Sequence, residues 1–549
     1  MVASVLRQRR NTRAAEPGGL PLLAVVRAMS VPPAVSQALA ARVKRGLAWS
    51  LVNNLVLRLG GLLVGILLAR ILSPDVFGVY AVGLTAQTIL QTLAELGLSA
   101  DLIRRGDITR RAPTVATIGL AVSVVLALIT CLLAEPIAVL LGDSAGAPVI
   151  RVLAITLVLS GVSAVPYAIA QRQFMQKQQF AADAGGLVIT TAVTLALVAI
   201  GLGAMSLAWS RVAGQIFSTV AQFRFTRTIP RFGFDLAVAT SSLRFGMPLA
   251  AANLLSWVLL NVDYIIVGNQ GRSLALGFYV LAFNLSSWPT AAVGSALRAV
   301  AFPAFVELAD NPPLLRRAVV AAMELAWVAG LPIGVCLMVL ASPFIGVVYG
   351  DKWSDSAGPL VGLAAFGVLR VVFDVMASLL IAKGDSPRIL LVQALWIVTL
   401  APSIWLGMRW QGIAGVGWAH LIVALVIIYP AYLYAVWRHG FKAWEMTTGA
   451  VWPMASAVIS AVPTYFLSRS LDNDLMAVLT GGTVGVSLYF ALTFRWAKRR
   501  LRALKHSAAP AADRGGMAEK DLGIPSSPVP PQDSKTSNRL TSTERSQLA

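Results

Sequence analysis

Long apolar segments constrain this chain more than any short motif does. A helix needs about 20 apolar residues to cross a bilayer, and fourteen segments of suitable length occur in the 549 residues. They are expected at 47–71, 77–100, 113–133, 148–170, 184–202, 205–225, 243–268, 274–301, 315–341, 358–382, 388–408, 412–436, 447–468 and 474–495. Only 13% of the residues are charged, whereas soluble chains carry roughly 25%. We therefore predict an all-α integral membrane protein with about 14 transmembrane helices.

Loop charges predict which side of the membrane each loop faces. Loops after even-numbered helices hold Arg104, Arg105, Arg110, Arg111, Arg172, Lys177, Arg227, Arg231, Arg316, Arg317, Lys383, Arg388, Arg438 and Lys442, whereas loops after odd-numbered helices hold Arg272, Lys352, Arg409 and Arg469. Basic loops stay cytoplasmic, so both termini are expected in the cytoplasm. The net charge of +20 then faces anionic lipid, and we expect no nucleic acid as a partner.

The second half of the chain repeats the first. Phe77-Gly78-Val79-Tyr80 is echoed by Leu276-Gly277-Phe278-Tyr279, and Leu141-Gly142-Asp143 by Tyr349-Gly350-Asp351. The offset is roughly 200 residues and spans six helices, so the second copy enters the membrane from the same side. This predicts two parallel six-helix lobes related by an axis along the membrane normal, followed by two further helices.

The repeat also predicts the domain boundaries. We expect a basic disordered cytoplasmic tail at 1–43, an N-lobe of helices 1–6 at 44–235 and a C-lobe of helices 7–12 at 236–440. Helices 13 and 14 should occupy 441–496. The polar segment 497–549 is expected to be a second disordered cytoplasmic tail.

Polar side chains follow one face of the first two helices in each lobe. Candidate cavity residues are Asn54, Arg58, Gln91, Glu95, Asn253, Asn261, Asp263, Asn284 and Arg298. Polar groups in hydrocarbon usually face a cavity or one another, so these stripes predict a central polar cavity between the lobes. The alternative is that the side chains only form hydrogen bonds between packed helices.

Arg58 is the most informative of these residues because it lies in mid-helix and cannot lose its proton. A buried guanidinium needs an anion. That anion can be a substrate phosphate or a carboxylate such as Glu95 or Asp263, and the two can alternate. Two other features have structural interpretations: Arg370 and Asp374 are expected to neutralise each other at i, i+4, and His420 to form a satisfied hydrogen bond.

Several chemistries have no sequence signature here. The chain has no GxxxxGK[ST] motif, so it is not itself a P-loop ATPase. It has no catalytic constellation and no His-rich or Cys-rich cluster, and Cys131 and Cys336 are expected to be small packing residues. We therefore predict neither an enzyme nor a metal site. We expect no cofactor, apart from a coupling proton or sodium ion that Glu95 or Asp263 could bind.

Several loop and helix motifs stand out in both lobes. In the first lobe these are residues 68–80 (LARILSPDVFGVY), 95–98 (ELGL) and 102–105 (LIRR). In the second they are 245–249 (FGMPL), 261–268 (NVDYIIVG), 276–279 (LGFY), 296–298 (ALR) and 301–305 (AFPAF). These motifs resemble those of the polysaccharide transport family, which comprises Wzx-like oligosaccharide flippases of the multidrug/oligosaccharidyl-lipid/polysaccharide exporter superfamily. The resemblance covers roughly residues 44 to 495.

The resemblance implies a flippase of the bacterial inner membrane. Such a protein moves a polyprenyl-pyrophosphate-linked oligosaccharide to the outer leaflet by alternating access, for exopolysaccharide or lipopolysaccharide biosynthesis. Arg58 and, more weakly, Arg298 would be the cavity cations that meet the pyrophosphate. Membrane lipid, a polysaccharide polymerase and glycosyltransferases are the implied partners.

Three alternative functions make different demands on the sequence. A drug or cation antiporter of the same superfamily would have carboxylates without a central cation, and Arg58 counts against it. A membrane enzyme such as a polymerase would need a long external loop or a catalytic His/Asp group. A transport-dead scaffold that recruits glycosyltransferases through its basic tails is compatible with the sequence.

Overall fold

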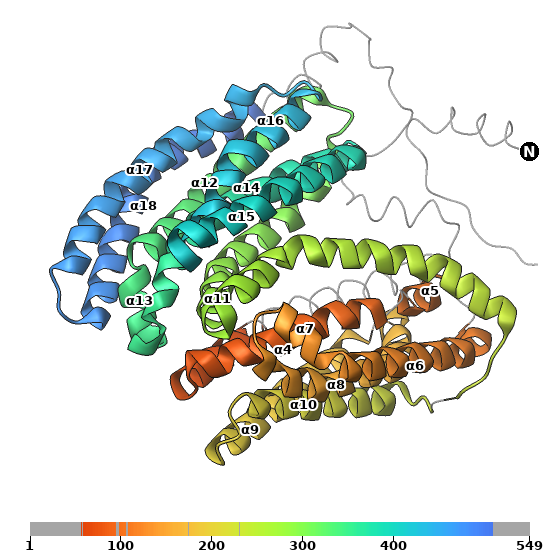
Figure 1. Ribbon diagram of the computed structural model, residues 1–549. Coiled ribbons are helices and arrows are strands. Elements are labelled where there is room, and N and C mark those ends of the chain that lie inside the picture. Colours follow the sequence, from red (N-terminus) through yellow and green to blue (C-terminus); the bar gives the residue numbers. More distant parts are fainter. Residues whose placement is uncertain are drawn as a thin grey trace, which may run out of the picture. The chain divides into compact units, whose positions relative to one another are not determined.

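The computed structural model describes residues 56–508 except 58, 95–97, 106–107, 174 and 230, and all the regular structure in this part of the chain is helical (Figure 1). A helix at Leu59–Ile71 precedes α4 (Pro74–Ala94), α5 (Leu98–Arg105), α6 (Ile108–Leu132), α7 (Ala134–Leu140), η1 (Ser144–Gly146), α8 (Ala147–Arg172), α9 (Gln176–Ala199) and α10 (Ala204–Thr226). Then follow α11 (Leu236–Glu307), α12 (Pro312–Val339), α13 (Ala341–Val348), η2 (Asp351–Ser356), α14 (Ala357–Ala382), α15 (Ser386–Val423), η3 (Ala424–Ile428), α16 (Tyr429–Trp437), α17 (Ala443–Arg469) and α18 (Asp474–Ala508).

Most helices match the expected apolar segments, and the main differences are at breaks and ends. The helix α11 contains one non-helical residue, Arg272, and α15 contains two, Gln411 and Gly412. Each break falls between two expected membrane segments. At the C-terminal end, α18 continues to Ala508, past the expected end at 495, because residues 497–505 are rich in strong helix formers. The expected N-terminal tail lies outside the described residues.

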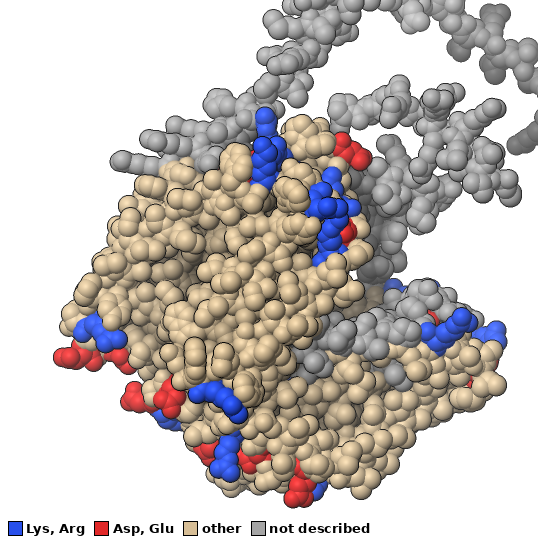
Figure 2. All heavy atoms as spheres, turned by 45° about the horizontal axis from the view of Figure 1, so that its top comes forward, with Lys and Arg blue, Asp and Glu red and all other residues tan. Residues whose placement is uncertain are grey.

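Nine helices in the described part of the chain are long and apolar enough to cross a membrane. This number treats residues 387–437 as one helix, so the expected total of about 14 stays a prediction. Figure 2 shows charged side chains at opposite margins of the visible face, with a broad uncharged band between them. Such a band is typical of a surface that contacts lipid.

The helices pack in two groups along the chain. Before residue 235, α8 contacts α4, α6 and α10, and α10 contacts α9. After it, α14 contacts α11, α12 and α15, and α12 contacts α17. The order of long helix, short helix, 3₁₀ turn and long helix occurs twice, as α6–α7–η1–α8 and as α12–α13–η2–α14. The sequence pattern did not predict the two short helices.

Glycines bring α4 and α11 into backbone contact. A Cβ atom on Gly277 would lie 2.5 Å from the carbonyl oxygen of Pro74, and one on Gly78 would overlap the carbonyl of Ser273. Nearby, a Cβ on Gly142 would overlap the backbone of Gly268. Small residues permit this approach, which gains van der Waals contact where the hydrophobic effect offers none. The motif glycines at 78, 142 and 277 are therefore packing residues.

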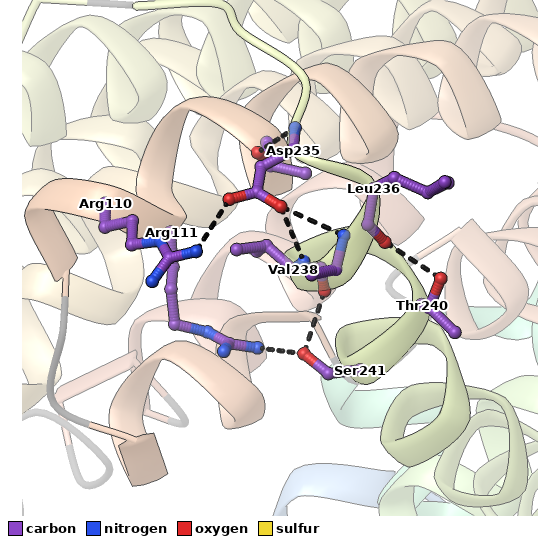
Figure 3. Close-up of polar contacts among 9 residues, drawn as sticks. Arg110, Arg111, Asp235, Leu236, Val238, Thr240 and Ser241 are labelled. Atoms are coloured by element: carbon purple, nitrogen blue, oxygen red, sulfur yellow. Dashed lines mark hydrogen bonds and ion pairs between the residues drawn. The ribbon is translucent and has the colours of Figure 1, made fainter.

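These glycines lie at what we call the low-charge rim, formed by the loops at residues 72–73, 141–146, 269–273 and 349–356. The opposite basic rim comprises the loops at 227–235, 308–311, 383–385 and 438–442, together with α5, the starts of α6, α12 and α17 and the end of α8. At the basic rim, Asp235 caps α11 by accepting hydrogen bonds from Ala237 N–H (2.9 Å) and Val238 N–H (3.2 Å). Arg110 donates to Asp235 at 3.0 Å, which lowers the pKa of that carboxyl, and Arg111 reaches Ser241 at 2.9 Å (Figure 3).

The backbone contact makes a prediction about stability. Gly277→Ala should destabilise the protein by about 1–3 kcal/mol, because the added methyl meets backbone atoms that cannot move aside alone. The control is Gly61→Ala, where the described residues leave open space around the new methyl; it should be neutral or slightly stabilising. Thermal unfolding of the purified variants in detergent measures both effects, and equal melting temperatures would contradict the packing role.

Candidate functional site

For four of the nine predicted cavity residues, the side chain lies outside the described part of the structure. Asn54, Arg58 and Glu95 lie outside the described residues, as does the side chain of Asn253. The polar stripe of the first helix, and the role of Arg58 in particular, therefore stay predictions. The other five residues lie on α4 and α11, and their surroundings can be described.

Gln91 takes part in a short hydrogen-bonded chain between two helices. The amide nitrogen of Gln87 donates to the Gln91 side-chain oxygen at 2.8 Å and to the hydroxyl of Thr156 on α8 at 3.0 Å. Gln87 is buried, and Gln91 is half-buried. Gln87 therefore forms a hydrogen bond between two packed helices, which was the alternative to a place in the cavity wall. The amide nitrogen of Gln91 has no hydrogen-bond partner among the described residues, so it can still donate to a ligand.

Asp263 is a carboxylate enclosed by the second half of the chain, with only 2% of its surface exposed. It accepts a hydrogen bond from the Tyr279 hydroxyl at 2.7 Å and from the backbone N–H of Tyr264 at 3.0 Å. The break at Arg272 divides α11 into two arms, one before it and one after it. Asp263 lies on the first arm and Tyr279 on the second, two turns past the break, so this hydrogen bond joins the two arms. A buried charge is tolerated only where such partners surround it.

His420 is the second ionisable group at Asp263. Its Nδ1 lies 3.0 Å from the carbonyl oxygen of Val416. A carbonyl can only accept, so Nδ1 carries a hydrogen. The other ring nitrogen, Nε2, lies 3.8 Å from the Asp263 carboxylate. The pair can therefore share one proton, held either as an imidazolium or as a carboxylic acid. The expected hydrogen bond of His420 is present, and its closeness to Asp263 was not predicted.

The expected neutralisation of Arg370 by Asp374 is only indirect, because the two side chains interact electrostatically but form no direct ion pair. Asp374 forms its ion pair with Arg298 of α11 instead. The reason is steric: the Asp374 carboxylate lies over Gly294, where a Cβ atom would meet it at 2.5 Å, one turn before Arg298. Arg370 donates to the Ser287 hydroxyl at 3.2 Å and lies over the ring of Phe366. Arg298, predicted as a cavity cation, already has an anionic partner.

A cavity of about 190 Å³ lies beside Asp263, Arg370 and His420. Its polar lining comes from Asp263, Arg370, Gln393, His420 and Tyr432, on α11, α14, α15 and α16, and the rest is apolar or aromatic. It lies among helices of the second half of the chain. Its opposite charges can hold a proton, a small cation or one acidic group.

The two remaining predicted residues, Asn261 and Asn284, lie on the same helix but not in this cavity lining. Asn261 is half-buried and Asn284 is exposed. Among the residues that the structure describes, no group of three His, Cys, Asp or Glu side chains could hold a metal ion.

Asp101, which is fully buried on α5, is not among the residues predicted from the sequence. It accepts from Arg111 at 2.7 Å and from the Ser242 hydroxyl at 2.8 Å. This cluster ties α5 and α6 to the start of α11. A signal was present, because Asp101 lies beside Leu98 and Leu102 on the apolar face of the helix, where an unpaired charge could not stay.

A reciprocal contact at the low-charge rim was also not predicted from the sequence. Arg70 ends the helix at Leu59–Ile71, and its guanidinium donates to the carbonyls of Val347 and Val348 at the end of α13. Lys352, just past α13, donates to the carbonyls of Arg70 (3.0 Å) and Leu72 (2.6 Å). Each cation therefore caps the C-terminal end of the other's helix, where unpaired carbonyls carry partial negative charge.

A buried tryptophan completes this contact. The indole N–H of Trp353 donates to the Ala69 carbonyl at 2.8 Å. Its ring packs edge-on against Phe77 of α4 at 5.2 Å and Phe278 of α11 at 6.0 Å. At the same rim, the Ser273 hydroxyl donates to Asp143. The two halves of the chain are thus joined at the low-charge rim by hydrogen bonds as well as by glycine contacts.

Comparison with known families gives one match that covers more than half of the chain. The family model described as "Polysaccharide biosynthesis protein" matches residues 67–358. This range includes the low-charge rim, Asp101 and Asp263. The resemblance to polysaccharide transport proteins that the motifs predicted is confirmed.

Two bacterial relatives match over most of their length. The lipopolysaccharide biosynthesis protein WzxC of Escherichia coli (strain K12) is 25% identical over 441 residues, which cover 78% of this chain and 88% of the relative. The succinoglycan biosynthesis transport protein ExoT of Rhizobium meliloti (strain 1021) is 25% identical over 478 residues, covering 82% and 93%. Their names describe biosynthesis and transport proteins, and neither names an enzyme.

Solved structures share the fold at low sequence identity. The lipid II flippase MurJ, in an inward closed conformation, matches with a TM-score of 0.68 at 12% identity, over 83% of this chain and all of that one. An inward-facing multidrug resistance transporter of the MATE family in the MOP superfamily matches with a TM-score of 0.56 at 16% identity, over 70% and 95%. At these identities the likeness establishes the fold alone.

The surroundings of Asp263 make a testable prediction. Tyr279→Phe removes one of its hydrogen bonds without changing the ring, and should destabilise the protein by about 1–3 kcal/mol, the usual range for a bond to a charged group. Tyr434→Phe is the control, because the Tyr434 ring is 61% exposed. Melting temperatures in detergent compare them, and an equal shift for both would rule out a structural role for the Tyr279 hydroxyl.

Proposed function

The chain belongs to this family of polysaccharide biosynthesis proteins, and from that premise we propose that it is a flippase for lipid-linked oligosaccharide. The substrate would be a polyprenyl-pyrophosphate-linked oligosaccharide that crosses the bacterial cytoplasmic membrane by alternating access, for exopolysaccharide or lipopolysaccharide biosynthesis. The names of the two relatives and the flippase fold support this class of function. A polymerase and glycosyltransferases are the proposed partners.

The proposed topology has fourteen crossings, two parallel six-helix lobes at 44–235 and 236–440, and both termini in the cytoplasm. The breaks at Arg272 and at Gln411-Gly412 support this number, since each divides one continuous helix into two segments of membrane length. The repeated order of long helix, short helix, turn and long helix supports the duplication. The low-charge rim would then face outward and the basic rim the cytoplasm.

The observation that carries the proposal is the pattern of contacts at the low-charge rim. All the bonds of Arg70, Lys352 and Trp353 described above run between the proposed lobes and go to backbone carbonyls. Water can replace each bond when the rim opens, so the net free energy of each is only about 1–3 kcal/mol. A few such bonds favour closure without preventing opening, as a reversible outer gate requires.

The proposed substrate site is the polar surface between the lobes. Arg58 is the proposed cation for the pyrophosphate, with Asn54, Gln91, Glu95, Asn253, Asn261 and Asn284 as polar wall. Arg298 can serve the same anion only if Asp374 releases it. Such an exchange would couple substrate binding to a change in the second lobe, because Asp374 lies on α14 and Arg298 on α11.

The driving force is proposed to enter at Asp263. The carboxylate and the His420 Nε2 atom at 3.8 Å can hold one proton between them, and both groups line the same cavity of about 190 Å³. A sodium ion at the same carboxylate is the alternative. This buried acid also fits a drug or cation antiporter of the same superfamily, which is the second candidate function. The scaffold function depends on tails that lie outside the described residues.

Removal of the gene tests the function directly. Cells without it should accumulate lipid-linked oligosaccharide on the cytoplasmic side, and the wild-type gene should restore export. Arg58→Ala should fail to restore it at normal protein levels, because the pyrophosphate loses its charge partner. Arg438→Ala, an exposed arginine of the basic rim, is the control. Export that persists with Arg58→Ala rules out the proposed site, and drug sensitivity without accumulation indicates the antiporter.

Cross-linking tests the outer gate. Asp143→Cys and Ser273→Cys, made together after Cys131 and Cys336 are replaced by serine, should form a disulfide that holds the low-charge rim closed. Transport in vesicles should stop on oxidation and return on reduction. The control pairs Asp143→Cys with Ser470→Cys, which lies in another loop and should not cross-link. Full transport by the completely cross-linked protein would contradict opening at this rim.

A further inference from the structure

A second cavity lies at the basic rim, away from all the residues assigned above. It has a volume of about 290 Å³ and lies between α6, α8, α10 and the segment that follows α10. Its inner wall is apolar, with Val162, Val165, Ile169 and Phe223 among the lining side chains, and Ala116 lines it from α6. Arg227 and Arg231 also belong to its lining. The cavity therefore combines an apolar body with two cations.

The segment that forms one side of this cavity is held in place on α6. The hydroxyl of Thr117 donates to the Gly233 carbonyl at 2.9 Å, and the Gly233 N–H donates back at 3.1 Å. The Asp235 N–H donates to the Thr114 hydroxyl at 3.1 Å, close to the ion pair with Arg110 (Figure 3). These bonds fix the cavity before any ligand arrives, which lowers the entropic penalty of binding.

The two arginines are exposed and form no hydrogen bond or ion pair with another residue in the described part of the chain. Other arginines of the same rim, such as Arg110, Arg111 and Arg316, are paired with carboxylates. Arg227 directly follows the last turn of α10. Its positive charge is therefore partly stabilised by the carbonyl groups at the C-terminal end of that helix. Arg231 has no such helix end beside it. Among the described residues, no carboxylate neutralises the charge of this cavity, and the phosphate of a ligand can do so.

Apolar side chains beside the arginines are unusually exposed. Ile229, Phe232, Phe234 and Leu236 are 76%, 57%, 67% and 70% exposed. Four large apolar side chains in one short segment are unfavourable in water but favourable at the boundary between lipid headgroups and acyl chains. This places the cavity at headgroup depth, where its apolar interior opens toward acyl chains and its arginines toward phosphates.

We propose that this cavity binds one anionic phospholipid, with an acyl chain in the apolar body and the phosphate at Arg227 and Arg231. Guanidinium groups bind phosphate through charge-assisted hydrogen bonds. The site depends on the membrane location of the protein but not on the proposed flippase activity. It is a resident lipid site, separate from the path of the transported molecule.

Binding to the purified, delipidated full-length protein tests this site. Native mass spectrometry would follow titration with dioleoyl phosphatidylglycerol and, separately, with dioleoyl phosphatidylcholine. The wild type should bind one phosphatidylglycerol more tightly than phosphatidylcholine. Arg227→Gln with Arg231→Gln should weaken phosphatidylglycerol binding by roughly 30-fold, since each basic side chain near an anionic surface contributes roughly fivefold. Arg172→Gln, an exposed arginine of the same rim outside the cavity, should change nothing.

A second variant tests the apolar body independently. Ala116→Phe fills the cavity without altering the arginines and should weaken binding of both lipids. Unchanged phosphatidylglycerol binding by either the double arginine variant or Ala116→Phe would overturn the proposal. So would displacement of bound phosphatidylglycerol by undecaprenyl pyrophosphate at a lower concentration, because the occupant would then be the carrier lipid.

Discussion

The backbones of α4 and α11 touch at Gly78 and Gly277, and much of the structure depends on this contact. Because no side chain separates the two helices there, the loops at the low-charge rim come within hydrogen-bonding distance of one another. Trp353 can then pack against both helices, and Arg70 and Lys352 can reach each other's helix ends. The cationic caps therefore depend on the glycine contact, which brings the two helix ends within reach of Arg70 and Lys352.

Buried charge in the second half of the chain is organised by the same requirement for partners. Asp263 has Tyr279 and His420, and Asp374 has Arg298, so each carboxylate is held by a group from another helix or another arm of α11. An ion or an anionic ligand that enters must exchange with one of these partners. The interactions that make the charges tolerable therefore also connect any binding event to the packing of helices.

The two rims differ in chemistry. At the low-charge rim, cations pair with neutral carbonyls, and the glycine contacts are close. At the basic rim, arginines pair with carboxylates such as Asp101, Asp235 and Glu445, while Arg227 and Arg231 have no carboxylate partner among the described residues. Bonds to carbonyls are weaker than bonds between opposite charges. The low-charge rim is therefore the more easily separated of the two, as the proposed outer gate requires.

The sequence by itself determined the class of protein, the position of most helices, the internal repeat and the family. These properties follow from hydropathy and motifs, which are local in the chain. A membrane helix forms all its backbone hydrogen bonds within its own segment, so it can be recognised without its neighbours. Only the tertiary structure decided the partners: Arg298 rather than Arg370 for Asp374, His420 for Asp263, and two helix ends for Arg70 and Lys352. A partner depends on which helices touch and where a glycine such as Gly294 leaves room, and no spacing along one helix contains that information.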